Sequence, residues 1–344
     1  MIPFVLSEEQ RKGLLVAVIS GGRPKLEQRR THGLLHELKA FGCDVAWIVV
    51  EHEAEEYERD DHEIVTYPTD WAIDYARSHW TDIQQPKDPL LRGGLGSSGR
   101  EFAAIEAERR GCWGVLQLDD NLLCLSVGRG SKSSIDFARN NGGLALFADI
   151  LGAVTLATNS RMTGAQLQAV AREPAVIARP GIPYSVFIEQ TGPGREHWYG
   201  PCEHDIMQAF QYSHRADGAT AAVVSPLRYQ KCGNVAGGFR SIYDHSRSAG
   251  LQRMFPEVAK IGVRKSFANG RGGARVFHTM APGAVRNPLR VHDRELMGAA
   301  KSKVEGLLRL WHPQQLADNR AKIAARVERA GLTPPAAPDV PSST

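Results

Sequence analysis

The chain contains little cysteine for its length, and its apolar runs are short. It has five cysteines in 344 residues, none in a CxxC pair: Cys43, Cys112, Cys124, Cys202 and Cys232. This odd, widely spaced set argues against a disulfide framework or a zinc site and favours a reducing cytoplasm. No run approaches the roughly 18 apolar residues of a membrane helix, so we expect no membrane span. The first residues lack the basic and apolar regions of a secretory signal, and we expect none there.

Two nucleotide-binding signatures are also missing. The sequence has no GxxxxGK[ST] loop, and the glycines after its first apolar run, Gly21 and Gly22, are adjacent instead of spaced as GxGxxG. These absences exclude the phosphate loop of many NTPases and the dinucleotide fingerprint. The composition is otherwise that of a globular protein, with 42% hydrophobic residues, 23% charged residues and 34 glycines. It excludes disordered, collagen-like and coiled-coil proteins.

Charge is unevenly distributed along the chain, although the net charge is only +4. Residues 44–63 contain nine acidic residues and one basic residue. Residues 228–294 contain thirteen Lys or Arg and three acidic residues, a local charge near +10. A basic segment of this kind attracts polyanions, because each neutralised phosphate releases counterions. The alternative is a solvated basic surface balanced by the acidic strip.

Apolar runs alternate with helical patterns along the first 120 residues. We expect strands at 13–20, 45–50, 63–67 and 113–118, and helices at 26–41 and 100–110. Continuous apolar strands that alternate with helices are typical of a parallel βαβ arrangement.

The remainder of the chain predicts further strands and helices. We expect helices at 144–158, 163–172 and 203–214, and strands at 184–189, 220–224 and 274–278. Residues 295–330 predict one or two amphipathic helices that break near Pro313. The Pro/Ser-rich tail from Pro334 is expected to be disordered.

An acidic pair, Asp119-Asp120, follows directly after the fourth apolar run, and Asn121 comes next. Ligands of open α/β sheets bind beyond the carboxyl ends of strands. Two adjacent carboxylates repel each other unless a cation or hydrogen bonds compensate. A divalent cation, Mn²⁺ or Mg²⁺, that bridges these oxygens to a diphosphate would explain the pair. A solvated turn or a helix N-cap is the alternative.

The order of these elements resembles the donor half of GT-A-fold glycosyltransferases. The resemblance rests on the apolar strand with its Gly turn, on LGSSGREFAAIEAERRG before a strand, and on VLQLDDN. It implies an α/β fold with a mixed, mostly parallel sheet flanked by helices and a C-terminal helical extension. It also implies a nucleotide-sugar-binding half at 1–127, an acceptor-binding half at 128–294, C-terminal helices at 295–332 and a disordered tail at 333–344.

The same resemblance implies which residues bind the donor and the metal. The donor residues would be Ser20, Gly21, Gly22, Arg23, Glu51, Arg100, Gln117, Asp119 and Asp120. The metal ligands would be Asp120, Asn121 and His278, although Asn121 stands where the family has a third acid. Arg100 either clamps the diphosphate or pairs with Asp119 or Glu101. The donor would be a UDP-sugar such as UDP-glucose.

The segment WYGPCEHD, residues 198–205, resembles the place where this family approaches its acceptor. Glu203 or Asp205 would then deprotonate the acceptor hydroxyl if the reaction inverts configuration. In a retaining reaction the same carboxylates would only position the acceptor. Alternatively, both are first-turn acids that stabilise a helix dipole.

A narrower resemblance is to the TET-associated glycosyltransferases of phages and bacteria. It rests on LQLDDN, WYGPCEHD, PLRYQKCGNVAGGFRSIYD and RKSFANGRGGARVFH. It implies that the acceptor is 5-hydroxymethylcytosine or 5-hydroxymethyluracil in DNA, and that the compartment is the host cytoplasm if the chain is phage-encoded. The implied acceptor and DNA residues are Trp198, Tyr199, Arg228, Tyr229, Lys231, Arg240, Arg271 and Arg275.

Two other functions remain compatible with the sequence. One is a sugar-nucleotide nucleotidylyltransferase, for which GGRPK at residues 21–25 is a partial match to the expected signature. The other is a non-catalytic DNA-binding protein on a degenerate transferase fold, which Asn121 in place of an acid keeps open.

Overall fold

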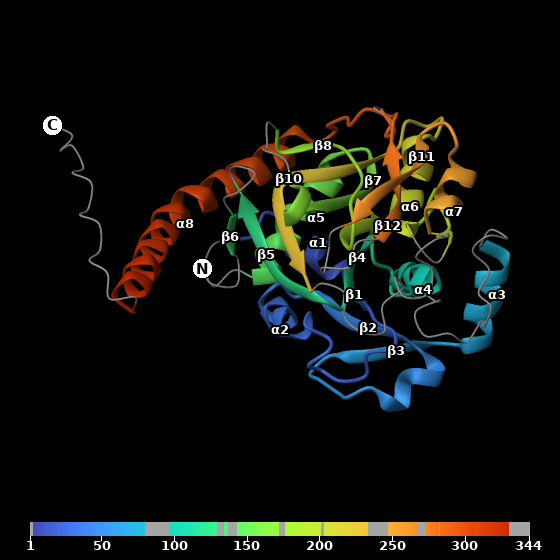
Figure 1. The fold of residues 1–344 in the computed structure, drawn as a ribbon, viewed down its shortest axis with the longest axis horizontal. Helices are drawn as coiled ribbons and strands as arrows, with labels where there is room; N and C mark the ends of the chain where they lie inside the picture. Colours follow the sequence, from blue (N-terminus) through green and yellow to red (C-terminus); the bar gives the residue numbers. More distant parts are fainter. Residues whose placement is uncertain are drawn as a thin grey trace.

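A computed structural model describes residues 3–79, 96–128, 134–136, 143–171, 176–200, 203–232, 247–266, 273–281 and 283–329. Its centre is a ten-stranded mixed sheet (Figure 1). The strands lie in the spatial order β3 (Glu63–Tyr67), β2 (Asp44–Val50), β1 (Leu14–Ile19), β4 (Gly114–Asp119), β9 (Val186–Gln190), β7 (Ser160–Leu167), β10 (Thr220–Lys231), β5 (Leu122–Gly128) and β6 (Ser134–Asp136). The short β8 (Ala178–Pro180) pairs with β10.

The parallel part of the sheet is β3-β2-β1-β4, as the alternating pattern predicts. At β4 the pairing changes, because β9 runs antiparallel to it. Beyond β9, β10 is parallel to β7 and antiparallel to β5. The predicted α/β class, with a mixed sheet flanked by helices and a C-terminal helical extension, is confirmed.

Helices cover both faces of the sheet. They are α1 (Glu8–Lys12), α2 (His32–Leu35), α3 (Thr69–His79), α4 (Gly96–Arg109), α5 (Gly143–Ala157), α6 (His204–Ser213), α7 (Arg247–Met254) and α8 (Arg294–Arg329). Short 3-10 helices follow α2 (η1, His36–Ala40), β2 (η2, Glu51–Glu56) and β7 (η4, Gln168–Val170). Among the described residues no helix is long and apolar enough to cross a membrane.

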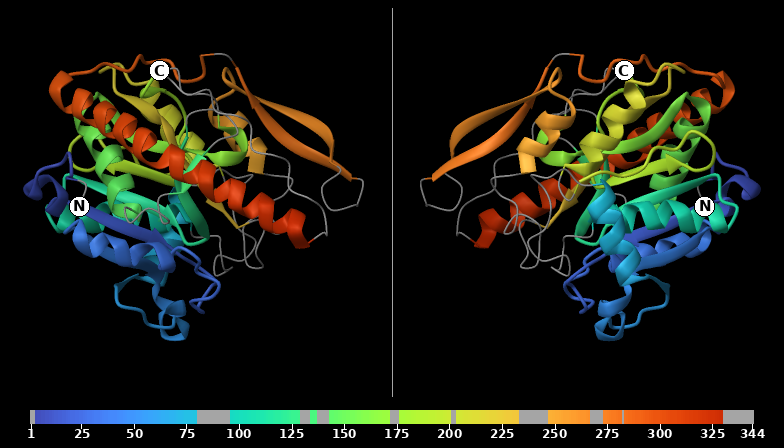
Figure 2. Two further views of the ribbon diagram at one scale, coloured as in Figure 1. Left: turned by 90° about the vertical axis from the view of Figure 1, so that its left-hand side faces the viewer. Right: turned by 90° about the vertical axis from the view of Figure 1, so that its right-hand side faces the viewer.

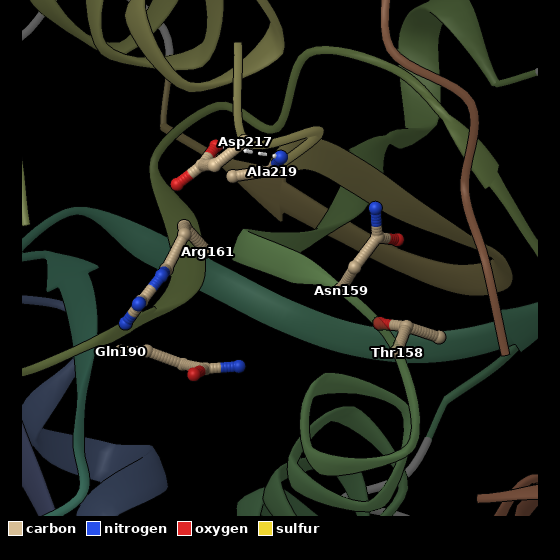
Figure 3. A pocket seen from close by; sticks show the side chains of 6 residues that line it. All are labelled: Thr158, Asn159, Arg161, Gln190, Asp217 and Ala219. Atoms are coloured by element: carbon tan, nitrogen blue, oxygen red, sulfur yellow. Dashed lines mark hydrogen bonds between the residues drawn. The ribbon is translucent and has the colours of Figure 1, made fainter. Parts of the chain in front are cut away.

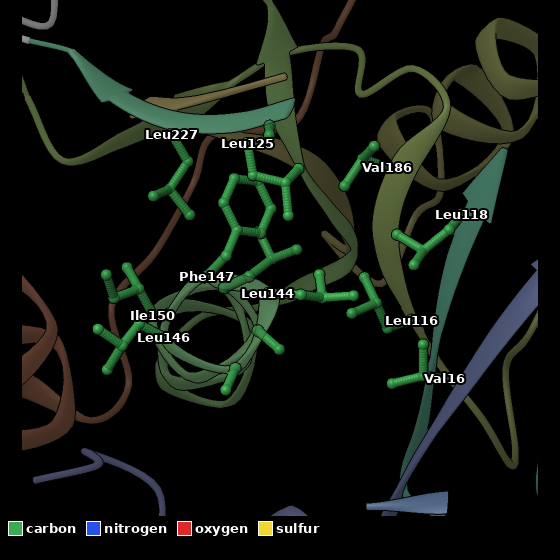
Figure 4. Close-up of a cluster of buried hydrophobic side chains, with 14 of the residues drawn as sticks. Val16, Leu116, Leu118, Leu125, Leu144, Leu146, Phe147, Ile150, Val186 and Leu227 are labelled. Atoms are coloured by element: carbon green, nitrogen blue, oxygen red, sulfur yellow. The ribbon is translucent and has the colours of Figure 1, made fainter. Parts of the chain in front are cut away.

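The alternation of side chains along the central strands builds two cores. Val16 and Val18 of β1 face α5, whose surroundings are drawn in Figure 4. Leu15 and Ala17 point to the opposite face, where Ala103 of α4 packs. Since both faces of β1 are covered, its run is apolar throughout, which is why the sequence signal was strong.

Three local expectations were wrong. Residues 163–172, expected to be helical, form most of β7 and η4, because Met162 to Gln166 are buried between β9 and β10. Residues 26–41 contain only the short α2 and η1. α8 continues through Pro313 as one helix, and its second half extends beyond the sheet (Figure 1).

Gly164 of β7 gives a test of this packing. An added Cβ would lie 2.3 Å from Pro183 Cβ and 2.5 Å from the Val186 carbonyl oxygen. We expect Gly164→Ala to lower the free energy of unfolding by about 3 kcal/mol, measured by urea denaturation. The control is Gly298→Ala at an exposed position of α8, where no atom lies within 4 Å of the new Cβ. It should leave stability unchanged or raise it by up to about 1 kcal/mol. Equal effects of the two changes would contradict the β7 packing.

Candidate active site at the carboxyl ends of the parallel strands

The acidic pair lies where β4 ends, at the edge formed by the carboxyl ends of β1, β2 and β4. Asp119 is the last residue of β4 and pairs in register with Ile19, the last residue of β1. Ser20 follows Ile19 directly. Asp120 is only 2% exposed, whereas the Asp119 side chain is 24% exposed. The two carboxylates therefore differ in solvent access although they are adjacent in the chain.

Asp119 is held by two cations. Arg100 Nη2 donates to Asp119 Oδ1 at 2.6 Å, and Lys231 Nζ lies 3.3 Å from Oδ2. Lys231 Nζ also donates to Ser185 Oγ at 2.9 Å. Burial disfavours the charged carboxylate, but Lys231 and Arg100 outweigh it and hold the pKa of Asp119 well below its usual value. Asp119 is therefore ionised at neutral pH.

Asp120 has a different set of partners. Ser20 Oγ donates to Asp120 Oδ2 at 2.7 Å, and the Arg23 guanidinium forms an ion pair with Oδ1. Tyr57 Oη lies 3.1 Å from Ser20 Oγ. Burial raises the pKa of Asp120 to about 6, against the opposing effects of Arg23 and Ser20. The three predicted donor residues Ser20, Arg23 and Asp120 are thus brought together.

The Gly21-Gly22 turn connects Ser20 to Arg23. Gly22 adopts a φ of +66°, which glycine accommodates without strain. Its backbone N–H donates to Glu53 Oε2 at 2.6 Å, and Glu53 is buried. Glu51, the acid that the sequence suggested here, is exposed on η2. Glu53 is therefore the acid that supports this turn.

Arg100 and Gln117 are buried next to the site and hold its residues by hydrogen bonds. Arg100 is 3% exposed and donates from Nε to His204 Nε2 at 2.9 Å and from Nη1 to Gln117 Oε1 at 3.3 Å. Its guanidinium lies over the rings of Phe187 and Trp198, with its Cζ atom at 5.0 and 5.6 Å from their centroids. All three guanidinium nitrogens are thus used within the protein. Of the alternatives left open by the sequence, Arg100 takes the pairing with Asp119.

Two buried carboxylates next to the site were not among the predicted site residues, although the sequence offered Glu101 as a possible partner of Arg100. Glu101 accepts Arg195 Nη2 at 2.6 Å and Nη1 at 3.0 Å, and the Trp198 backbone N–H at 3.1 Å. Glu189 accepts Gln117 Nε2 and Trp198 Nε1, both at 3.0 Å. Burial raises the pKa of Glu189 to about 6. The only sequence signal for Glu189 was Gln117, a polar residue inside an apolar strand.

The predicted acceptor-side residues Glu203 and Asp205 lie at the start of α6. Glu203 is the N-cap residue and has a φ of +56°, which is uncommon for a residue with a side chain. His278 Nδ1 of β12 (Gly273–Met280) lies 3.7 Å from Glu203 Oε1. Asp205 Oδ1 accepts the Ile206 backbone N–H at 3.0 Å. The structure therefore pairs His278 with Glu203.

The predicted metal ligands are only partly supported by the geometry. Within the described ranges, no group of three or more His, Cys, Asp or Glu side chains is arranged to hold a metal ion. Asn121 Oδ1, however, is a buried acceptor with no hydrogen-bond donor. A hard cation would satisfy that oxygen, so Asn121 beside Asp120 fits a divalent metal. For His278, the contact observed is the one with Glu203.

The structure corrects part of the predicted acceptor surface. Trp198, Arg228 and Tyr229 are fully buried, so their side chains cannot line an exposed DNA surface. Tyr199 is half-buried beside His79, and Lys231 points to Asp119. Arg240 and Arg271 lie outside the described residues, and Arg275 is described only as a backbone position of β12.

A pocket lies at the opposite edge of the sheet, where β9 ends at Gln190 (Figure 3). Its polar lining is engaged with nearby protein groups. Asp217 pairs with Arg215 at 2.5 Å, and Arg161 Nη2 donates to the Pro193 carbonyl at 2.9 Å. Asn159 Nδ2 donates to the Gly218 carbonyl at 2.6 Å. These contacts give the pocket a structural role.

No family model and no curated protein matches the chain. Among solved structures, a mycobacterial protein is 10% identical with a TM-score of 0.44, over 82% of this chain and 92% of the other. Glucosyl-3-phosphoglycerate synthase from Mycobacterium tuberculosis, in complex with Mg²⁺ and UDP, is 9% identical with a TM-score of 0.41, over 79% and 92%. Similarities this low assign neither a family nor a function.

Proposed function

We propose that the chain is a glycosyltransferase that moves a sugar from a nucleotide-sugar donor, such as UDP-glucose, to a hydroxyl acceptor. The proposed acceptor is 5-hydroxymethylcytosine or 5-hydroxymethyluracil in DNA. The observation that carries the proposal is the meeting of Asp119 and Asp120 with Arg23 and Lys231 at the carboxyl ends of parallel strands. This edge is where open α/β sheets bind their ligands.

The donor side has the groups that a diphosphate requires. Arg23 is 14% exposed and Lys231 is 33% exposed, so both can be reached by a ligand. The first turn of α4 packs beside the end of β1, since a Cβ on Gly99 would lie 3.0 Å from Ile19 Cγ2. Backbone N–H groups at a helix N-terminus favour phosphate. Arg100 acts as a positioning residue, because it holds Asp119.

A divalent cation, Mn²⁺ or Mg²⁺, would be held by Asp120 and Asn121, whose buried amide oxygen lacks a donor. When bound, such a cation neutralises charge that develops on a departing nucleoside diphosphate. Arg23 forms an ion pair with one oxygen of Asp120 and lies beside the residues that would hold the cation, so its guanidinium is placed to bind a diphosphate at the same site. Lys231 stabilises the same developing charge.

The acceptor side would be formed by the start of α6 and by His278. The acceptor oxygen forms a bond to the anomeric carbon as the bond from that carbon to the diphosphate breaks. In an inverting reaction, Glu203 or Asp205 takes the hydroxyl proton. The proximity of His278 to Glu203, 3.7 Å, supports an acid–base role for this pair. The leaving group is the nucleoside diphosphate.

Nucleoside mass spectrometry tests the proposal. Purified protein is incubated with Mn²⁺, a mixture of nucleotide sugars, and DNA that contains 5-hydroxymethylcytosine or 5-hydroxymethyluracil. A hexose- or N-acetylhexosamine-sized mass gain on the modified nucleoside is expected. Hydrolysis of a nucleotide sugar without that gain would retain the transferase and overturn the DNA acceptor. Absence of both would overturn the proposal.

A non-catalytic DNA-binding protein is the second candidate. One observation favours it: in the structure every carboxylate oxygen of Asp119 and Asp120 already has a partner within the protein. A site that is self-neutralised in this way needs no cation or diphosphate to compensate it. The Asp120 variant discussed below separates the two candidates.

A further inference from the structure

The hairpin formed by β11 (Ala259–Ser266) and β12 stands apart from the main sheet. Among the strands that the structure describes, these two pair with each other alone, from Ala259 opposite Met280 to Ser266 opposite Gly273. Its base is anchored by Val258 and Ala259, which pack against Leu251 of α7 and Phe210 of α6. The rest of the hairpin projects from the body of the protein (Figure 2).

The charge of the hairpin has one sign only. Its two strands contain four Lys or Arg and no Asp or Glu: Lys260, Arg264, Lys265 and Arg275. This local charge of +4 equals the net charge of the whole chain. A projecting, purely cationic segment is complementary to a polyanion.

The two faces of the hairpin differ. In an antiparallel pair, residues directly opposite each other share a face. Lys260 and Thr279 form one such exposed pair. The other face carries Ile261, which is 39% exposed, and Val263, which is 66% exposed. His278 lies opposite Ile261 and is on the same face. Because His278 lies beside Glu203, this second face runs outward from the candidate site.

We infer that the hairpin enters the major groove of duplex DNA, an inference that rests on the proposed DNA acceptor. The major groove is about 12 Å wide and admits a two-stranded ribbon. Eight residues of each strand extend about 27 Å, enough to follow the groove. In this arrangement Lys260, on one exposed face, lies against phosphates, and Val263, on the other, lies against apolar groups on base edges.

The same groove carries the proposed acceptor atom. The C5 position of a pyrimidine, where thymine has its methyl group, faces the major groove. A 5-hydroxymethyl group therefore projects into the groove that the hairpin occupies. Since the hairpin face with Ile261 and Val263 leads back to His278 and Glu203, it directs a groove-exposed hydroxyl toward the candidate site. The hairpin thereby selects duplex DNA among polyanions.

A charge-neutralised hairpin tests this inference. The variant carries Lys260→Ser, Arg264→Ser and Lys265→Ser in the full chain. Its matched control loses three exposed cations elsewhere, through Lys12→Ser, Lys39→Ser and Arg77→Ser. Thermal unfolding of both variants checks that they remain folded. Binding to an unmodified 20-base-pair duplex is measured by fluorescence anisotropy between 50 and 200 mM salt.

We expect the hairpin variant to bind duplex at least about 10-fold more weakly than the control, with a shallower salt dependence. Transfer to 5-hydroxymethyl-dCMP, which has no groove, should be the same for both. Equal weakening in the two variants, or tighter binding of single-stranded DNA or RNA than of duplex DNA, would overturn the inference.

Two further results separate the inference from the proposed function. Duplex binding that depends on the hairpin, without any sugar transfer, would support the hairpin surface and reject the transferase. Transfer to 5-hydroxymethyl-dCMP by a wild-type protein that does not bind duplex would support the transferase and overturn the hairpin surface.

Discussion

Asp120→Asn is expected to lower sugar transfer by about 100-fold or more while leaving duplex-DNA affinity unchanged. The substitution keeps the size of the side chain but removes the charge that holds Arg23 and would hold a divalent cation. Loss of one electrostatic contact to the developing charge typically costs this much in turnover. The measurement is the initial rate of transfer, with DNA binding followed by anisotropy on the same preparation.

The stability of this variant has an expected sign. The pKa of Asp120 is about 6 in the folded protein, against an ordinary value of 3.8. The folded chain therefore holds this proton more tightly than the unfolded chain does. Wild type should lose stability relative to Asp120→Asn as the pH rises through about 6. A fall in activity at pH 7.5 is then not caused by unfolding.

Asp217→Asn is the matched control, since Asp217 is an ion-paired aspartate at the opposite edge of the sheet. It should transfer sugar at the wild-type rate. If Asp120→Asn were fully active, Asp120 would have no part in the reaction. If neither wild type nor variant transferred sugar while both bound DNA, the non-catalytic DNA-binding protein would be the better account.

Glu101→Gln is expected to lower the free energy of unfolding by about 3–5 kcal/mol at pH 7. Glu101 is 1% exposed and accepts both terminal nitrogens of Arg195, whose side chain is only 8% exposed. The amide removes the buried counter-charge of that guanidinium and leaves it paired only with the more exposed Glu108. Chemical denaturation measures the loss, and local disorder at Trp198 should accompany it, because its backbone N–H donates to Glu101.

The pH dependence of that loss follows from the pKa of Glu101. Burial opposes ionisation, but Arg195 and His197 outweigh it and hold this pKa below the ordinary 4.5. A depressed pKa contributes stability above the ordinary value and loses it as the pH falls. The difference between wild type and Glu101→Gln should therefore be full at pH 7 and shrink below about 4.5.

Glu108→Gln is the control for this prediction. Glu108 lies on the same helix and also pairs with Arg195, at 3.0 Å, but its side chain is 35% exposed. An exposed pair contributes little, so we expect a loss below about 1 kcal/mol. Similar losses in the two variants would show that burial of Glu101 is not what makes its ion pair important.

The strands that the sequence predicted best belong to the parallel part of the sheet. The run at 63–67 matches β3, and the run at 113–118 differs from β4 by one residue at each end. Residues 163–172 were misassigned because their composition includes good helix formers, and only the neighbours β9 and β10 make them a strand. Long-range pairing of this kind leaves no local periodicity.

The acidic pair of the candidate site was predictable from the sequence, but the side chains that hold it in place were not. Asp119 and Asp120 were visible because two acids directly follow an apolar strand. Lys231 and Asp119 are 112 positions apart in the sequence, and no local pattern predicts that they are in contact. Arg228 and Tyr229 were taken for surface residues because β10 was expected to end at 224, whereas the buried strand continues to 231.

Asp119 forms ion pairs with two residues, Arg100 and Lys231, that are synthesised at different times. Arg100 and the strands β1 to β4 are complete by residue 119, whereas Lys231 is added at the end of β10. A nascent chain that has emerged only as far as β9 holds both carboxylates but lacks the ammonium of Lys231. The site can therefore reach its final charge only after most of the polypeptide has been synthesised. Chains that end before Lys231 lack this positive charge beside Asp119.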